Sequence, residues 1–205
     1  MKRLIDIVGA SLGLICLSPL LVVIAVLVRI TVGRPVFFRQ VRPGYREVPF
    51  RVCKFRTMTA AVDDRGVPLP DRDRLHPFGT FLRKTSLDEL PELWNVLCGE
   101  MSLVGPRPLL VEYLPFYSDE ERVRFSVRPG ITGWAQVNGR NQTGWNQRLQ
   151  QDTWYVQNQS LRLDLAILWK TLATVGQRHG VTADPHSAML DLNEERTTVA
   201  PERAR

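Results

Sequence analysis

The chain has 205 residues, 44% of them hydrophobic and 23% charged, which is ordinary for a folded protein and suits one domain with attachments. Its formal net charge of +6 fits nucleic acid, an anionic membrane surface or phosphate-bearing substrates, and cannot choose among them. The three cysteines match no zinc or redox spacing, so free thiols in a reducing compartment are expected. The three histidines are scattered, and no metal cluster or Ser/His/Asp pattern can be built from them by sequence proximity.

The N-terminus carries an uncharged apolar run over residues 7–28. Roughly 20 apolar residues cross a bilayer as a helix, so the run is too long for a typical buried core helix, and it is not a convincing secretory signal. The pair Ser18-Pro19 lies in its middle and predicts a kink, because proline removes one backbone donor and clashes with the preceding turn. The Ser18 hydroxyl can satisfy a carbonyl that the kink sets free.

Basic residues flank this run on both sides and bear on its topology. If positive flanks stay on the cytoplasmic side, both ends of the run belong there. A kinked, re-entrant helix that enters and leaves by one face meets this demand, whereas a straight span, the alternative, does not. The flanking basic residues are Lys2 and Arg3 before the run and Arg29, Arg34, Arg39 and Arg42 after it.

Seven basic residues and one acid, Glu47, lie within residues 33–56, interleaved with valines and phenylalanines. This composition indicates a surface that meets lipid headgroups or substrate phosphates, or else a solvated basic face. Residues 51–58 alternate in part and predict a short strand. Residues 59–77 are rich in Pro, Asp and Arg and predict a mobile loop, which is either a binding loop or a linker.

Residues 78–101 carry leucines at helical spacing, which predict a helix with a buried apolar stripe. Asp88 and Glu89 lie at its start and have two interpretations. As structural residues, Glu89 forms a capping box with Ser86, and Asp88 is a first-turn acid favoured by the helix dipole. As functional residues, Asp88 stays ionised, as a nucleophile must, while Glu89 holds a divalent cation or orients the reacting group. The expected stripe is Leu87, Leu90, Leu93, Trp94 and Leu97, and Arg83 and Lys84 supply positive charge upstream.

Two loops follow this helix. Pro106 and Pro108 flank Arg107 and restrict its backbone, which suits a guanidinium that grips a phosphate in fixed geometry. Residues 130–141 are glycine-rich and indicate a binding loop or, alternatively, a structural turn. The polar side chains of this segment are Gln136, Asn138, Arg140 and Asn141.

A second leucine stripe occurs near the C-terminus, formed by Leu161, Leu165, Leu168, Leu172 and Val175. It predicts a helix that either packs on the catalytic domain or lies in the membrane interface, helped by Trp154, Tyr155 and Trp169. The tail over residues 181–205 is polar and aperiodic, so we expect it to be flexible.

Four motifs together resemble the bacterial sugar transferase family, which consists of monotopic phosphoglycosyl transferases that act on polyprenyl phosphate. They are KFRTM at 54–58, SLDELPELWNVLCGEMSLVGPRP at 86–108, EYLPFYS at 112–118 and VRPGITGWAQVNGRN at 127–141. The motifs occur in the family's order, and the resemblance covers about residues 1–180. In length the chain is similar to minimal members that consist of the catalytic module alone.

The resemblance implies transfer of a sugar 1-phosphate from a nucleoside diphosphate sugar, expected to be a UDP-sugar, to polyprenyl (undecaprenyl) phosphate with release of UMP. This is the first membrane step of bacterial glycoconjugate assembly. Asp88 would be the nucleophile that forms a covalent phosphosugar-aspartate, and Glu89 would complete the dyad. Mg²⁺ is the implied cofactor, with Asp88 and Glu89 as its candidate ligands. Ser18-Pro19 matches the break of the family's re-entrant helix, and the polar residues around its active site are matched by Lys54, Arg83, Arg107, Arg140 and Asp152.

The expected fold is helix-rich α+β. A re-entrant membrane helix occupies 1–30, a catalytic domain with amphipathic interfacial helices and a small β-hairpin occupies 31–180, and the tail occupies 181–205. The expected location is the bacterial cytoplasmic membrane, with the active site on the cytoplasmic face. One rival is a membrane-anchored basic interaction protein, which leaves the Pro-Arg-Pro and glycine-rich loops unexplained; another is a nucleic-acid binder, for which no recognised motif is present. These residues leave the sugar and the oligomeric state open.

Overall fold

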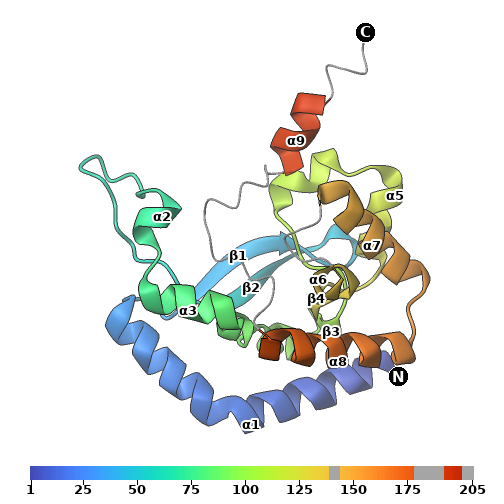
Figure 1. Cartoon of the computed structure of the whole chain (residues 1–205), viewed down its shortest axis with the longest axis horizontal. Coiled ribbons are helices and arrows are strands. Elements are labelled where there is room, and N and C mark those ends of the chain that lie inside the picture. The colour runs from blue at the N-terminus through green and yellow to red at the C-terminus, as the bar shows by residue number, and fades with distance from the viewer. Residues whose placement is uncertain (139–143, 178–191, 200–205) are drawn as a thin grey trace.

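The computed structural model describes residues 1–138, 144–177 and 192–199. Helices surround two small sheets, which confirms the expected helix-rich α+β class (Figure 1). The helices are α1 (Lys2–Thr31), α2 (Asp71–Arg74), α3 (Pro77–Thr85), α4 (Glu92–Cys98), α5 (Asp119–Arg122), α6 (Trp134–Val137), α7 (Trp145–Gln157), α8 (Leu161–Gln177) and α9 (Leu192–Val199). The strands are β1 (Phe37–Pro43), β2 (Pro49–Phe55), β3 (Ser102–Val104) and β4 (Gly130–Thr132), and 3-10 turns lie at Tyr45–Glu47, Leu87–Glu89, Val111–Phe116 and Val123–Ser126.

The two sheets join segments from different parts of the chain. β1 and β2 form the expected antiparallel hairpin, with Phe37 opposite Phe55 and Pro43 opposite Pro49. β3 and β4 pair in parallel, with Ser102 opposite Gly130. The parallel pair brings the loop after β3 next to the glycine-rich segment that follows β4, so the two candidate binding loops lie together.

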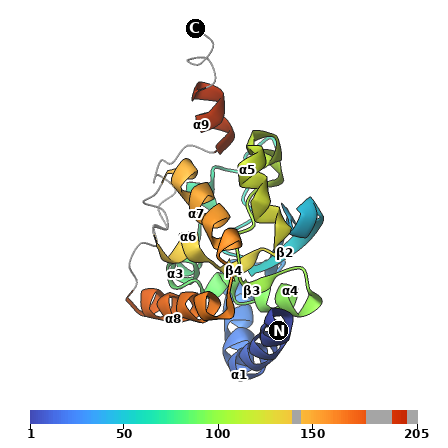
Figure 2. The same cartoon turned by 90° about the vertical axis from the view of Figure 1, so that its right-hand side faces the viewer.

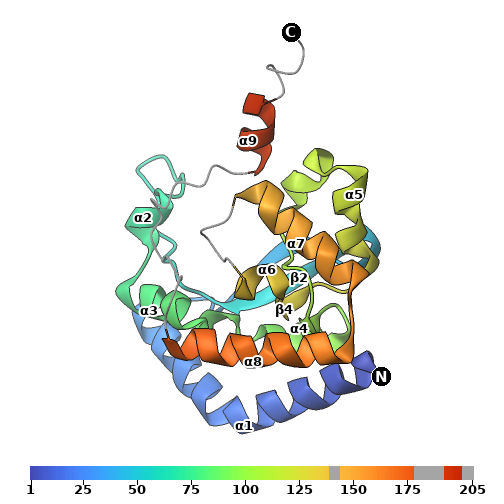
Figure 3. The same cartoon turned by 45° about the vertical axis from the view of Figure 1, so that its right-hand side comes forward.

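Helix α1 is the one helix in the described parts of the chain that is long and apolar enough to cross a membrane. Only 11% of its most apolar stretch is buried, whereas a core helix of similar composition is mostly covered. Pro19 lies inside the helix and cannot donate to the carbonyl of Ile15. The Ser18 hydroxyl donates to that carbonyl at 2.8 Å instead, and the ribbon curves beneath the other elements (Figures 1 and 3).

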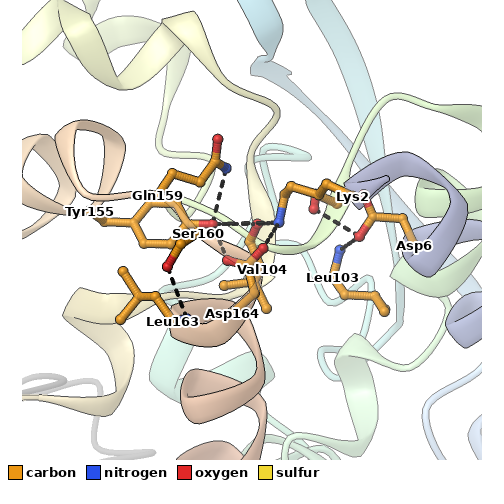
Figure 4. A network of polar contacts seen from close by, with 10 residues as sticks. Lys2, Asp6, Leu103, Val104, Tyr155, Gln159, Ser160, Leu163 and Asp164 are labelled. Carbon is orange, nitrogen blue, oxygen red and sulfur yellow. Dashed lines mark hydrogen bonds and ion pairs between the residues drawn. The ribbon is translucent and has the colours of Figure 1, made fainter.

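Polar contacts fasten the first turns of α1 to the rest of the protein (Figure 4). Lys2 Nζ donates to Asp164 Oδ2 of α8 at 2.7 Å and to the carbonyl of Val104 at 2.9 Å. The buried Asp6 carboxylate accepts a hydrogen bond from the Ser102 hydroxyl at 2.9 Å. A charged start of an apolar helix is thereby tied to β3 and α8.

Apolar packing attaches the last turns of α1. Ile24 and Val28 are buried against Phe55 of β2 and Leu82 of α3. Between the two attachments, Ile15 is 70% exposed. Both ends of the helix therefore lie on the same body, while its middle presents bare apolar surface.

Helix α3 packs closely against the main chain of Thr57, in the segment after β2, at Gly79. A Cβ atom at this position would lie 2.0 Å from the carbonyl oxygen of Thr57, and the three nearest atoms all belong to the Thr57 main chain, which cannot move aside as a flexible side chain can. We expect Gly79→Ala to lower the free energy of unfolding by about 2–4 kcal/mol, because overpacking against backbone forces a shift of the helix. Thermal denaturation checks this. Gly144→Ala is the control, since a Cβ at that position meets no atom of the described residues within 4 Å. Equal Tm values for the two variants would contradict the expectation.

Helix α4 corrects one part of the expected leucine stripe. Trp94 is 60% exposed, so its assignment to the buried stripe was wrong. The neighbouring Asn95 is buried instead, because its amide donates to the Arg51 carbonyl at 2.8 Å and accepts from the Cys53 amide at 3.0 Å. The inward face of α4 is set by this polar bond to β2, which leaves the indole outside.

Helix α8 turns part of its leucine stripe outward. Leu165 and Leu172 are 61% and 70% exposed, whereas Asp164 and Ile167 are buried. The inward face is fixed by the bond from Lys2 to Asp164 and by a 2.7 Å hydrogen bond between the hydroxyls of Thr132 and Thr171. The stripe was expected either to pack on the domain or to lie in the membrane interface. Leu165 and Leu172 do not pack on the domain.

Part of the polar tail forms α9, at the opposite end of the molecule from α1 (Figure 2). Leu192 is fully buried against an aromatic cluster that includes Tyr113 and Trp145. Arg196 donates to Glu121 Oε1 at 2.6 Å. One apolar anchor and one ion pair thus attach residues 192–199, while the flexibility of the tail stays a prediction.

Candidate active site

An open cavity of about 1560 Å³ lies between the hairpin, α3, the 3-10 turn Leu87–Glu89, the loop after β3, and helices α6 and α7. Most of the residues that the sequence singled out line it: Lys54, Arg83, Asp88, Glu89, Arg107, Gln136 and Asp152. Asn138 does not belong to the lining, because its amide donates to the Trp134 carbonyl at 2.9 Å and accepts from Lys170 at 3.2 Å. Arg140 lies outside the described residues.

Asp88 lies in a tight connection between α3 and α4. Ser86 ends α3 in the left-handed conformation with φ of 57°, and the chain then enters the 3-10 turn that carries Asp88 and Glu89. The side chain of Ser86 caps nothing here, so the expected capping box with Glu89 was wrong. The left-handed turn points the two carboxylates into the cavity instead of toward a helix end.

Asp88 is only 8% exposed, and no hydrogen bond to its carboxylate occurs among the described residues. Burial, followed by the negative charge of Glu89, raises the pKa of Asp88 from 3.8 to about 6, although Lys54, Arg107 and Arg83 oppose this. The carboxylate is therefore ionised at pH 7 but poorly solvated. A group in this state is an effective nucleophile.

Glu89 is held by two cations. Lys54 Nζ donates to Glu89 Oε1 at 2.6 Å. Arg107 donates from both terminal nitrogens, one bond of 3.3 Å going to Oε2 and a shorter one going to Oε1. Burial alone would raise the pKa of Glu89, but Arg107 and Lys54 outweigh it and hold that pKa far below its usual range. Glu89 is thus a permanent anion that fixes two cations beside Asp88.

A second buried carboxylate, Glu92, was not singled out from the sequence. It is 2% exposed and lies 3.2 Å from Lys54 Nζ, so that Lys54 is shared between Glu92 and Glu89. Burial, partly opposed by Lys54, raises the pKa of Glu92 to about 7. At helical spacing Glu92 lies opposite the expected leucine stripe, so periodicity predicted an exposed side chain and gave no signal of this carboxylate.

Other side chains complete the wall around these carboxylates. Arg83 Nε donates to the Thr57 hydroxyl at 3.0 Å, which orients its guanidinium from α3. Gln136 donates to the Ile131 carbonyl at 3.0 Å, and its Oε1 is buried without a partner among the described residues. Asp152 forms an ion pair of 2.9 Å with Arg124.

Six arginines of the lining were not among the predicted site residues: Arg39, Arg42, Arg56, Arg74, Arg124 and Arg148. Burial, and then repulsion by Arg107, lowers the pKa of Arg42 and of Arg148. Like charges gathered in one cavity favour an anionic ligand that offsets them. The basic stretch predicted such a surface, but only the fold shows which of its arginines face the cavity.

The comparisons with known proteins agree with this geometry. Residues 1–178 match the family described as bacterial sugar transferase. An uncharacterized sugar transferase of Bacillus subtilis, EpsL, is 49% identical over 186 residues, covering 91% of this chain and 92% of that protein. The exopolysaccharide production protein ExoY of Sinorhizobium fredii is 39% identical over 191 residues, covering 85% of this chain and 84% of that protein.

A larger relative is named for its activity. The UDP-glucose:undecaprenyl-phosphate glucose-1-phosphate transferase of Klebsiella pneumoniae is 45% identical over 181 residues. That stretch covers 83% of this chain but 39% of the relative, so the chain spans about two fifths of that enzyme's length. The resemblance read from the four sequence motifs is confirmed: the chain belongs to the bacterial sugar transferase family and is a phosphoglycosyl transferase.

Proposed function

We propose that the protein transfers a sugar 1-phosphate from a UDP-sugar to undecaprenyl phosphate through a covalent intermediate on Asp88. The observation that carries this is the Asp88 carboxylate itself, buried and unbonded among the described residues, beside cations in an open cavity. The name of the Klebsiella relative, a UDP-glucose:undecaprenyl-phosphate glucose-1-phosphate transferase, supports a UDP-sugar as the donor and undecaprenyl phosphate as the acceptor. The names of the ExoY relatives support a place in exopolysaccharide production.

The chemistry consists of two displacements at one phosphorus atom. An Asp88 oxygen attacks the β-phosphorus of the donor, and the bond from that phosphorus to the bridging oxygen breaks, so that UMP leaves with the electron pair. A phosphate oxygen of the lipid then attacks the same phosphorus and displaces Asp88 as a carboxylate. The products are UMP and a polyprenyl diphosphate sugar. A carboxylate nucleophile divides one difficult transfer into two steps.

The cations around Asp88 have a defined task in both steps. Two phosphate-bearing substrates bring several negative charges to one site, and charge moves to the leaving group as each bond breaks. Glu89 holds Lys54 and Arg107 in place before the substrate arrives, so little reorganisation is needed at the moment of reaction. Glu89 therefore acts as an orienting anion for two phosphate-binding cations.

Magnesium is the cofactor that the family implies, and the donor set fits it in one way. Mg²⁺ takes oxygen ligands and is commonly held by one or two carboxylates together with substrate phosphates. Within the described ranges no group of three or more potential metal-ligating side chains occurs, but Asp88 offers oxygens that no described residue bonds. The residues thus fit an ion held by Asp88 together with the donor's diphosphate, while both Glu89 oxygens already accept bonds from Lys54 and Arg107. When bound, it would offset negative charge as UMP departs.

The membrane helix explains how a lipid acceptor reaches this site. Both ends of α1 are attached to one body, and its bare middle carries Ser18-Pro19. We propose that α1 enters and leaves the bacterial cytoplasmic membrane by its cytoplasmic face, which keeps Asp88 at headgroup level. The exposed Leu165, Trp169 and Leu172 of α8 would lie in the same interface.

Cysteine labelling tests this topology. In a variant without the native cysteines, we expect single cysteines at positions 2 and 34 to react with an impermeant maleimide only in inside-out vesicles. A re-entrant helix keeps both flanks on the cytoplasmic side, whereas a span separates them. Reaction of position 2 in right-side-out spheroplasts would contradict the proposal.

A nucleotide-release assay tests the activity. Purified protein in lipid nanodiscs is mixed with Mg²⁺, undecaprenyl phosphate and each of a panel of UDP-sugars, and UMP and lipid-linked sugar are measured. We expect equal amounts of UMP and polyprenyl diphosphate sugar with at least one donor. Headgroup binding without UMP release from any donor would instead support a membrane-anchored interaction protein.

The pH dependence of transfer should report the state of Asp88. Because the pKa of Asp88 is raised to about 6, we expect kcat/KM to fall about tenfold per pH unit below pH 6, as the nucleophile becomes protonated. Glu92, with its pKa raised to about 7, is a second carboxyl group of this site that titrates in this range. Glu92→Gln should keep the acidic limb near pH 6. Loss of that limb in Glu92→Gln would assign it to Glu92 and contradict the expectation.

A further inference from the structure

Arg124 is a buried arginine whose guanidinium joins three separate segments. It lies in the 3-10 turn Val123–Ser126 and is 3% exposed. Its Nη1 donates to the Tyr117 hydroxyl at 2.8 Å. Its Nη2 donates to Asp152 Oδ2 of α7 at 2.9 Å and to the main-chain carbonyl of Arg107 at 2.7 Å. A planar group with fixed donors sets the relative position of all three acceptors.

The bond to Arg107 concerns the residue that holds Glu89. Pro106 and Pro108 already restrict the backbone of Arg107. The carbonyl of Pro106 accepts the amide of Gly130 at 3.0 Å, and the carbonyl of Arg107 accepts Arg124. Two successive carbonyls are thus held, one by β4 and one by the turn that carries Arg124. The main chain of Arg107 is fixed in this way, and from it the guanidinium reaches Glu89.

Asp152 belongs to the same arrangement. Its carboxylate and the guanidinium of Arg124 are both almost fully buried, with side-chain exposures of 6% and 2%. Removing one partner of such a buried ion pair strongly destabilises the folded protein, because an unpaired charge remains buried. The negative charge of Asp152 is therefore committed to Arg124, although Asp152 lines the cavity.

We infer that Arg124 is a positioning residue that fixes the main chain of Arg107 and thereby aims the Arg107 guanidinium at Glu89, and that Asp152 acts by holding Arg124. This inference rests on the proposed function, in which Arg107 binds the donor's phosphate. Under this inference Asp152 does not contact the substrate but holds Arg124, which in turn positions Arg107.

Arg124→Lys is the informative substitution. Lysine keeps the positive charge for Asp152, but one ammonium group cannot reproduce the planar fork that serves three acceptors. Arg122→Lys is the matched control, because Arg122 lies two residues away, forms an ion pair with Glu47 and donates to the Leu114 carbonyl at 2.7 Å. Arg122 is not part of the cavity lining.

A double-mutant cycle with Arg107→Ala separates positioning from general support. In the wild-type background we expect Arg124→Lys to lower kcat/KM for the UDP-sugar by about 30- to 100-fold, since misplacement by about 1 Å costs on this order. In the Arg107→Ala background the same change should cost less than about threefold, because the group to be positioned is gone. Equal losses in the two backgrounds would overturn the inference.

The pH profile gives a readout that a merely structural role would not move. Lys54, Arg107, Arg83 and Glu89 are the charged groups that face Asp88, and Arg107 is one of those that lower its pKa. We expect the acidic limb of kcat/KM to shift to higher pH in Arg124→Lys and in Arg107→Ala, but not in Arg122→Lys. An unshifted limb in Arg124→Lys would count against positioning.

Thermal unfolding keeps the inference testable without the activity. If the wild type releases no UMP from any donor, the proposed function fails, and the cycle is then measured in Tm. We expect the Tm loss from Arg124→Lys to be smaller in the Arg107→Ala background, since the bond between Arg107 and Glu89 is already absent there. If Arg124→Lys does not fold, Asp152→Asn takes its place in the same cycle. Additive Tm losses would overturn the inference.

Discussion

Asp88→Asn is expected to abolish sugar-phosphate transfer, with kcat reduced at least about 10³-fold. Asparagine has nearly the same shape as aspartate but cannot form the covalent intermediate. No hydrogen bond among the described residues depends on the Asp88 carboxylate, so the substitution should not disturb the surrounding contacts. Release of UMP from the preferred UDP-sugar, with and without the lipid acceptor, is the measurement.

The same substitution should make the protein more stable at neutral and alkaline pH. The folded-state pKa of Asp88 is raised to about 6 from 3.8, so the folded protein disfavours the ionised form. The stability contributed by this group is fully present below pH 3.8 and is lost as the pH rises through 6. A shift of about two pKa units corresponds to at most about 3 kcal/mol, which asparagine would restore at pH 8.

Tm measurements at two pH values provide the control for this prediction. At pH 8 the Tm of Asp88→Asn should exceed that of the wild type, and at pH 4 the difference should nearly vanish. An inactive variant that is also less stable at pH 8 would indicate that Asp88 supports the fold, as the helix-start interpretation of the sequence holds. An active variant would remove Asp88 from the chemistry altogether.

Glu89→Gln is expected to harm both activity and stability. The glutamine cannot balance Lys54 and Arg107, which are left as neighbouring cations in a partly buried site. Because the pKa of Glu89 lies far below its ordinary value of 4.5, its stabilising effect is complete at pH 7 and is lost progressively as the pH falls below that value. We expect a loss of about 2–3 kcal/mol in the free energy of unfolding and a fall of about 10²-fold in kcat/KM.

Glu92→Gln is the matched comparison. Glu92 also pairs with Lys54, but burial raises its pKa to about 7, so it is partly neutral at that pH and contributes less as an anion. Chemical denaturation at pH 7 and steady-state kinetics should therefore show a smaller effect than in Glu89→Gln. A larger effect from Glu92→Gln would show that Glu92, and not Glu89, is the main partner of Lys54.

The parts of the fold that local patterns encode were predictable. The apolar run at the N-terminus, with Ser18-Pro19 at its centre, predicted α1. The Ser18 hydroxyl donates to the carbonyl of Ile15, which is the carbonyl that Pro19 leaves without a main-chain donor. Alternation in residues 51–58 marked one strand of the hairpin. These features depend on neighbours within a few residues, which a sequence displays directly.

The direction of a helix face was not predictable where polar contacts decide it. Trp94 and Leu165 fit apolar stripes, yet Asn95 and Asp164 determine which side of α4 and of α8 is buried. The partners of those two side chains lie in β2 and at the start of α1. Periodicity alone carries no information about such distant partners.

The candidate site shows the same limit. Asp88 and Glu89 could be singled out only because four motifs resemble a known family, since local pattern favoured a capping pair that the left-handed Ser86 does not form. Arg124 and Glu92 were missed, because their importance comes from contacts with Arg107 and Lys54 that appear only when the chain is folded. Asp152 was found by resemblance, and the structure places it against Arg124.

Trapping of the Asp88 adduct tests directly whether Asp88 is the nucleophile that forms a covalent phosphosugar intermediate. The protein is mixed with Mg²⁺ and its preferred UDP-sugar in the absence of polyprenyl phosphate, quenched with acid within seconds and examined by intact and peptide mass spectrometry. We expect one equivalent of UMP and a mass increase of one sugar phosphate on the peptide that contains Asp88, both absent from Asp88→Asn. Release of UMP only when the lipid acceptor is present, with no adduct at any time, would contradict this expectation.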